Sequence, residues 1–270
     1  MSVETSRPAH DPAEPIYRLY ENLVHTTPLD LDNGLGGKLL FAGRIGDAEE
    51  NSPARQLLYA ANIAGAASLA ASADPAALRQ AMRDGVIDFM VTSLEEALRI
   101  LKNEIRKRQA VSVGVAAAPQ MIVAAMLERG VLPDLLPPAS WPEEASGITP
   151  AQAEQFASQG ALPLPPPQAG EAFVTWSIES ESARDFALWL PKLDSCAEAV
   201  IPAADLARRR WVRLAPRYLG RLAHRHHGVA LSPEEIQTFR HQVSQLTAQQ
   251  PPESTLTIST STGGDTRSPS

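Results

Sequence analysis

Residues 87–115 read IDFMVTSLEEALRILKNEIRKRQAVSVGV, and this stretch decides the fold. The apolar run IDFMV is followed by a helix start at Ser93, because Glu96 stands three residues later and completes a capping box. Leu94 and Leu101 then recur on one helical face before a second apolar run, VSVGV. A strand, a helix and a second buried strand in this order predict a βαβ unit with parallel strands.

The same alternation of apolar runs and helical patterns continues on both sides of this unit. The predicted strands are 38–42, 67–71, 87–91, 111–115 and 132–136, and the predicted helices are 53–63, 75–83, 94–108 and 120–129. This order predicts an α/β domain over residues 16–138, built as a Rossmann-like parallel sheet with flanking helices.

Both ends of the chain and one internal stretch are poor in apolar residues. Residues 1–15 and 247–270 hold too little apolar material to offset the entropy of ordering, so a flexible N-terminus and a disordered tail are expected. Residues 139–170 include the run LPLPPPQAG, whose prolines favour an extended chain. This stretch is predicted to be a proline-rich linker between two folded parts.

Residues 171–246 predict a smaller part that passes from α/β to mainly helical structure. The run AFVTWSI alternates in the manner of a strand. A helical pattern starts at Ala203 with Pro216 as its break, and a last helix starts at Ser232, where Glu235 completes a capping box.

The composition limits the classes of function. A net charge of −7 opposes general binding to nucleic acid, which needs a surplus of Lys and Arg. The single cysteine, Cys196, cannot form an intramolecular disulfide. The longest small-apolar stretch, residues 57–73, falls short of the roughly 20 strongly apolar residues of a membrane span. A cytoplasmic protein without a membrane helix is therefore expected.

Several short motifs follow one another from about Gly36 to Asp134. They are GGKLLFAG, ANIAGAASLAAS, IDFMV with LEEAL, AVSVGVAAAPQ and ERGVLPDLL. Their order resembles that of the cofactor-binding domain of urocanase, the urocanate hydratase of histidine breakdown. The chain resembles the urocanase family over this region, and residues 197–218 are similar to a helix-forming stretch of its catalytic region. The resemblance implies tightly bound NAD, the hydration of urocanate to imidazolonepropionate, and a homodimer.

Two glycines and one acid are the candidate cofactor-binding residues. A dinucleotide site needs glycines after the first strand and an acid after the second strand. Gly43 and Gly46 meet the first need, and Asp74 lies just beyond the position of the second. However, the three carboxylates of the following segment, DAEEN, would repel a pyrophosphate, and Asp74 before Pro75 is equally a helix cap. NAD is thus implied by the resemblance and opposed by the residues.

Other positions depart from the family pattern. The family's Gly-Asn-Ala-Ala turn is replaced by VAAAPQ, with Ala116 or Ala117 in place of the amide, and its Gln-Thr-Ser-Ala-His run is replaced by PPASWPEEASG. The family's active-site cysteine precedes an Ile-Pro helix, and Cys196 lies too close to Ile201 to match it. We therefore assign no catalytic residue.

An arginine-rich segment runs from Arg208 to His227. It holds seven arginines and no acid, with Trp211, Leu214 and Tyr218 at helical spacing, which predicts a basic amphipathic segment. This segment is either a solvated or internally paired face, or a surface for phosphate, nucleic acid or an acidic partner.

Two smaller clusters are weighed as sites and set aside. His224, His226 and His227 would place two imidazoles on one helical face, but the sequence offers no further ligand cluster, so no metal is expected. A second cluster of acids in a Ser-rich loop favours a solvated turn over paired acid and base groups. Its members are Glu179, Glu181 and Asp185.

The predicted function is a urocanase-like protein that has lost hydratase activity and serves a binding, regulatory or assembly role. The expected partner is a second copy of the chain or a related full-length enzyme. One alternative is an active NAD-dependent urocanate hydratase-like lyase that uses altered residues. The other is polyanion binding through the arginine-rich helix.

Overall fold

A computed structural model describes residues 11–46, 52–166, 170–180, 183–223, 226–249 and 255–261. The chain divides into two compact units, one formed by residues 16–167 and one by residues 1–15 together with 168–270. Helix α1 (Ala13–Thr26) starts near the beginning of the described chain, within the first fifteen residues that were expected to be flexible. Among the described helices, none combines the length and the apolar content that crossing a bilayer requires.

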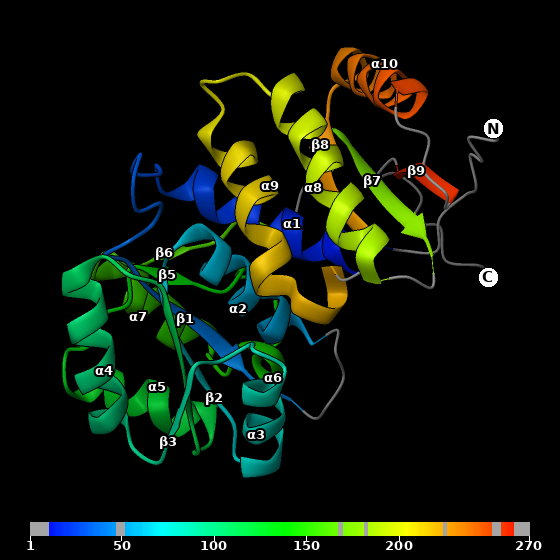
Figure 1. Ribbon diagram of the computed structural model, residues 1–270. Coiled ribbons are helices and arrows are strands. Elements are labelled where there is room, and N and C mark those ends of the chain that lie inside the picture. The colour runs from blue at the N-terminus through cyan, green and yellow to red at the C-terminus, as the bar shows by residue number, and fades with distance from the viewer. Residues whose placement is uncertain are drawn as a thin grey trace, which may run out of the picture. The chain divides into compact units, whose positions relative to one another are not determined.

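The unit of residues 16–167 contains a six-stranded parallel sheet (Figure 1). Its strands are β1 (Leu39–Arg44), β2 (Ala67–Ala71), β3 (Phe89–Val91), β4 (Val111–Val115), β5 (Leu135–Leu136) and β6 (Leu162–Pro163), in the order β3-β4-β2-β1-β5-β6. The central strands β2 and β4 are buried along their whole length, as a sheet covered on both faces requires. The predicted Rossmann-like parallel sheet is confirmed.

Helices cover both faces of this sheet. On one face, α4 (Leu94–Lys107), α5 (Pro119–Glu128) and α7 (Pro150–Ser158) share a core with the strands, with Leu101, Val123 and Phe156 among its members. On the other face, α2 (Pro53–Ala64) packs on β1 and β2, and α3 (Pro75–Arg83) lies near β3. The predicted N-cap at Ser93 is confirmed, because its hydroxyl accepts from Glu96 N, but the Glu96 carboxylate accepts from Thr92 N, one residue before the cap, so the capping box is not regular.

The prediction that the proline-rich stretch is an extended linker is wrong. Residues 139–170 include α6 (Glu143–Ser146), α7 and β6, and β6 extends the parallel sheet beside β5. Thr149 and Gln152 form a complete capping box at the start of α7. Pro163 is tolerated because β6 is the edge strand, where an amide donor is not needed on the outer side.

The second unit is built on a three-stranded antiparallel sheet in the order β8-β7-β9. Its elements are β7 (Ala172–Glu179), α8 (Ala183–Val200), α9 (Leu206–Leu219), the 3-10 turn η1 (Gly220–Ala223), β8 (His226–Leu231), α10 (Pro233–Gln249) and β9 (Thr255–Ser261). The predicted strand at 172–178 and the capping box of Ser232 with Glu235 are confirmed.

One expectation for this unit is met in part and one fails. Helices α8, α9 and α10 hold most of its described residues in regular structure, but they accompany an antiparallel sheet of three strands, where the sequence predicts one strand. Part of the expected disordered tail is β9, which pairs with β7 from Phe173 opposite Ser261 to Glu179 opposite Thr255. The alternation of β-branched residues in TLTIST suits a strand and offsets the low apolar content.

Large aromatic side chains fill the core of the second unit. Trp176 is 1% exposed, and its ring centroid lies 5.2 Å from that of Phe239 on α10. Trp211 on α9 is equally buried and donates from Nε1 to the carbonyl oxygen of Gly228 at 2.7 Å. These contacts fix α9 and α10 against the small sheet.

Candidate functional site

The carboxyl end of β1 is the candidate ligand site that the strand order indicates. β1 lies between β2 and β5, and the chain turns to opposite sides of it, which makes this end a topological switch point of the sheet. Open parallel sheets bind ligands in the crevice beyond such a point. Gly43 lies in β1 at a bulge, with φ +92°, a conformation that glycine adopts at little cost.

The protein's own backbone fills the space beside Gly43. A Cβ atom built on Gly43 would lie 2.7 Å from the carbonyl oxygen of Ala145 and 3.0 Å from that of Ser146. Gly147, at the end of α6, packs as closely against Pro119 in the first turn of α5. Residues 143–147 therefore lie between the end of β1 and the start of α5, where a ligand of the sheet would be sought.

The other candidate cofactor residues have different surroundings. Gly46 has no atom of a described residue within 4 Å of the position of an added Cβ. The three acids that follow it lie outside the described residues. Asp74 is the N-cap of α3, and its carboxylate accepts from Ala76 N at 2.8 Å and from Ala77 N at 3.3 Å. The carboxylate therefore already serves as a cap, and Gly43, Gly46 and Asp74 do not converge on a shared contact.

Helix α2 begins at Pro53, as the sequence predicts, but the polar groups at its start were not predicted as a candidate site. Its N-cap, Ser52, makes no capping bond, and its hydroxyl is buried without a hydrogen-bond partner among the described residues. Arg55, one turn into α2, is 2% exposed, and its Nη2 donates to Asp84 at 2.5 Å. Its Nε and Nη1 find no described partner. A basic residue within the apolar helix PARQLLYAANIA is the signal that would have indicated a buried charge.

The start of α5 lies at the carboxyl end of β4, where the resemblance to the family leads one to expect an amide side chain. Its N-cap is Ala118, which offers no side-chain cap, and Pro119 occupies the first turn. Ala116 and Ala117 precede it with methyl groups only. The turn of residues 116–118 between β4 and α5 therefore carries no amide side chain.

The fit to a dinucleotide is poor at two of three points. Gly43 is covered by α6, and Asp74 is bound to backbone amides. The start of α2 is the exception, since it offers unpaired donors that suit an anion.

Cys196 lies on α8 in the second unit and is half-buried. Burial raises the pKa of its thiol, so the reactive thiolate is disfavoured at neutral pH. The structure thus gives Cys196 the environment of a packing residue.

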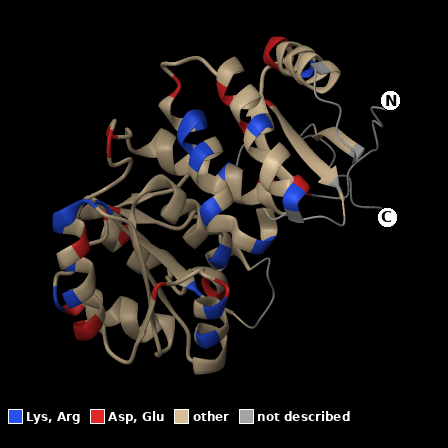
Figure 2. Cartoon of the chain, viewed as in Figure 1, with Lys and Arg blue, Asp and Glu red and all other residues tan. Residues whose placement is uncertain are grey.

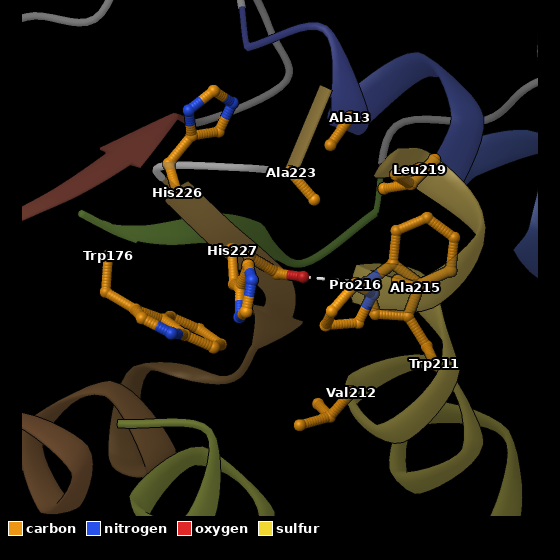
Figure 3. A pocket seen from close by; sticks show the side chains of 11 residues that line it. Ala13, Trp176, Trp211, Val212, Ala215, Pro216, Leu219, Ala223, His226 and His227 are labelled. Carbon is orange, nitrogen blue, oxygen red and sulfur yellow. Dashed lines mark hydrogen bonds between the residues drawn. The ribbon is translucent and has the colours of Figure 1, made fainter. Parts of the chain in front are cut away.

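The histidine cluster is not on a helix. His226 and His227 are neighbours on β8, so their side chains point to opposite faces of the sheet, as Figure 3 shows, and His224 lies outside the described residues. The helical prediction failed because α9 ends at Gly220, whose φ of +52° breaks the helix. Among the described residues, no cluster of three or more His, Cys, Asp or Glu could hold a metal.

Each of the two histidines pairs with a separate carboxylate. His226 Nε2 lies 3.6 Å from Asp11 Oδ1, which is ion-pair distance but beyond a hydrogen bond, and the Asp11 carboxylate raises the pKa of His226 against the opposing effect of burial. His227 Nδ1 lies 2.7 Å from Asp194 Oδ1, which also accepts from Trp176 Nε1 at 3.0 Å. The cavity that both histidines line has a volume of about 10 Å³, which is room for one water molecule.

Of the acidic cluster in the loop after β7, the structure describes one side chain. Asp185 accepts from the hydroxyl of Ser180 at 2.6 Å, near the start of α8. The side chains of Glu179 and Glu181 lie outside the described residues.

The arginine-rich segment is divided between paired and unpaired side chains. Arg208 bonds Glu235 and Asp205, each at 2.6 Å, and Arg209 bonds Glu198 at 2.8 Å. Burial lowers the pKa of Arg208, but its bonds to the two carboxylates outweigh burial and raise it. The first turns of α9 are therefore an internally paired face.

Comparison with known proteins agrees with the Rossmann-like fold of the parallel sheet. A family model for the Urocanase Rossmann-like domain matches residues 19–161, so the match ends one residue before β6 rather than at residue 138. The S-methyl thiourocanate hydratase of Variovorax sp. (strain JCM 16519 / RA8) is 24% identical over 142 residues, which are 51% of this chain and 25% of that protein. The matched stretch thus spans about a quarter of that relative's length. Because the family model covers more than half of the 270 residues, this chain belongs to the urocanase family.

Proposed function

We propose that this urocanase-family protein does not hydrate urocanate and serves a binding, regulatory or assembly role. The observation that carries the proposal is the packing of α6 on β1, where the carbonyl oxygen of Ala145 stands 2.7 Å from the position of a Cβ on Gly43. A dinucleotide needs that space, because its pyrophosphate approaches the backbone at the end of the first strand.

Two further residues support the same conclusion. The carboxylate of Asp74 caps α3 with both of its oxygens, so turning it toward a ribose hydroxyl would break two backbone hydrogen bonds. Burial raises the pKa of the Cys196 thiol, which disfavours an activated thiolate. Cys196 also belongs to the second unit and not to the unit that contains the parallel sheet.

The test is the cofactor content of the purified protein. An absorption spectrum and mass spectrometry of the denatured supernatant would detect bound NAD, and a calorimetric titration would detect added NAD. We expect neither signal and no turnover of urocanate. Co-purified or titratable NAD would overturn the proposal.

The alternative is an NAD-dependent hydratase-like lyase, and the start of α2 favours it. Ser52 and Arg55 together leave one hydroxyl and two guanidinium donors without a partner among the described residues, at a helix N-terminus. Such donors stabilise phosphate oxygens. If this alternative holds, Arg55→Met weakens NAD binding, and the substrate belongs to the urocanate class, as the name of the S-methyl thiourocanate hydratase suggests for that relative.

The partner proposed for this role is a second copy of the chain or a related full-length enzyme. The compartment proposed is the reducing cytoplasm, because the one cysteine has no pairing partner within the chain. Light scattering after gel filtration, alone and with a full-length urocanase, distinguishes the two partners.

A further inference from the structure

The later turns of α9 and the turn that follows carry exposed arginines. Arg213 and Arg217 lie four residues apart on α9, and Arg221 follows in η1. None of these three guanidinium groups forms an ion pair with a described residue, in contrast to Arg208 and Arg209. Figure 2 shows Lys and Arg recurring along α9. We call Arg213, Arg217 and Arg221 the basic strip.

An apolar row accompanies the basic strip. Leu214 and Tyr218 each follow an arginine of the strip and are half-buried, one helical turn apart. The Arg217 guanidinium lies 5.6 Å from the centroid of the Tyr218 ring. The surface therefore offers positive charges beside apolar atoms, and Arg and Tyr are the residue types enriched in protein interfaces.

We infer that the basic strip binds an acidic amphipathic segment of a partner protein. Carboxylates four residues apart on a helix repeat every ~6 Å, which is the spacing of Arg213 and Arg217 along α9. Apolar side chains next to those carboxylates would cover Leu214 and Tyr218. This inference names a partner class for the binding role proposed above and rests on that role, although it uses a different unit of the chain.

Nucleic acid fits the same surface less well. The basic strip has three charges over about 12 Å, whereas polyanion binding depends on many phosphate contacts made at once. The net charge of −7 repels an extended phosphate backbone. Trp211 is 1% exposed and Tyr218 is half-buried, so neither offers an open ring for base stacking.

The experiment uses the full chain and a labelled 20-residue helical peptide with Glu at every fourth position and Leu beside each Glu. Fluorescence anisotropy measures its Kd for the wild type and for a triple variant, Arg213→Gln with Arg217→Gln and Arg221→Gln. The matched control neutralises three exposed basic residues on α4, by Arg99→Gln with Lys102→Gln and Arg106→Gln. A peptide with Gln for Glu and a single-stranded 20-nucleotide DNA complete the set of probes.

We expect the strip variant to weaken the acidic peptide about tenfold, since three solvated ion pairs are lost, and the control variant to change it less than twofold. Added salt should weaken the wild-type complex. Equal losses in the two variants, absent peptide binding or tighter binding of the DNA would each overturn the inference. Detection of bound NAD would overturn the proposed function and leave the peptide result unaffected. Circular dichroism verifies that each variant is folded.

Discussion

Gly43 and Ala145 approach each other so closely that only a glycine fits in β1 at this point. The position of a Cβ on Gly43 is 2.7 Å from the Ala145 carbonyl oxygen, and φ is +92°. The glycine that a dinucleotide site would use for close approach is used here for close approach of the chain itself. A stability measurement can test this relationship directly.

Gly43→Ala is expected to destabilise the protein by roughly 2–4 kcal/mol, because left-handed backbone strain adds to the clash with α6. Urea unfolding gives the free energy. Gly46→Ala is the control, since none of the described residues has an atom within 4 Å of a Cβ added there, and its effect should stay below about 1 kcal/mol. Equal effects at the two glycines would show that α6 does not press on β1.

Two substitutions at Asp74 distinguish a helix-capping role from a cofactor-binding role. Asp74→Ala should cost about 1 kcal/mol in urea unfolding, because α3 loses its cap, whereas Asp74→Asn should change stability by only a few tenths. Both variants should leave a calorimetric NAD titration unchanged. A drop in NAD affinity in Asp74→Asn without a loss of stability would assign the residue to a cofactor instead.

The βαβ alternation could be predicted because each central strand is a short apolar run between helix start and stop signals. VSVGV and ASLAA are buried at every residue, so each keeps the uninterrupted pattern of a buried strand. Elements that lack this signal were missed. The strand β6 is two residues long within a proline-rich run, and α8 carries Pro191, which breaks the helical pattern.

The candidate site was harder to predict than the fold, because it depends on contacts between distant residues. The contact of Gly43 with Ala145 joins segments about a hundred residues apart, and neither segment carries a sequence signal that predicts the contact. In contrast, Asp74 before Pro75 is a local signal for a helix cap, and in the structure Asp74 is the N-cap of α3. The pairing of Arg55 with Asp84 is also non-local, and only the lone charge in an apolar helix indicates it.

The ion pair of Arg55 and Asp84 joins α2 to the end of α3, with the carboxylate also accepting from Gln80. Asp84→Asn is expected to cost roughly 2–4 kcal/mol, because it leaves the Arg55 guanidinium buried without a counter-charge. Adding Arg55→Met to Asp84→Asn should restore part of that loss. Urea unfolding of the two single variants and the double variant measures the coupling.

The control for this cycle is Lys38→Gln, which removes an ion pair with Asp134 whose side chains are 43% and 38% exposed. Solvent screens that pair, so the change should stay below about 1 kcal/mol. Should the double variant be as unstable as Asp84→Asn alone, the unpaired charge of Arg55 is not the cause.

The pairing of His226 with Asp11 makes stability depend on pH. Because Asp11 raises the pKa of His226 in the folded protein, the protonated form is favoured by folding. Its contribution is fully present below the unfolded pKa of about 6.5 and is lost as pH rises through the higher folded pKa. His226→Gln should therefore cost more stability at pH 6 than at pH 8.5, by less than about 1 kcal/mol for a partly exposed pair.

Asp11→Asn is the matched variant for this pH dependence, because the amide oxygen can still accept from Ala13 N, as Asp11 Oδ1 does at 2.8 Å. It removes only the charge that faces His226. Urea unfolding at pH 6, 7 and 8.5 should give the same loss profile in both variants, since each one breaks the same pair. A loss that is flat across this range, or that grows as the pH rises, would show that the pair with Asp11 does not govern the protonation of His226.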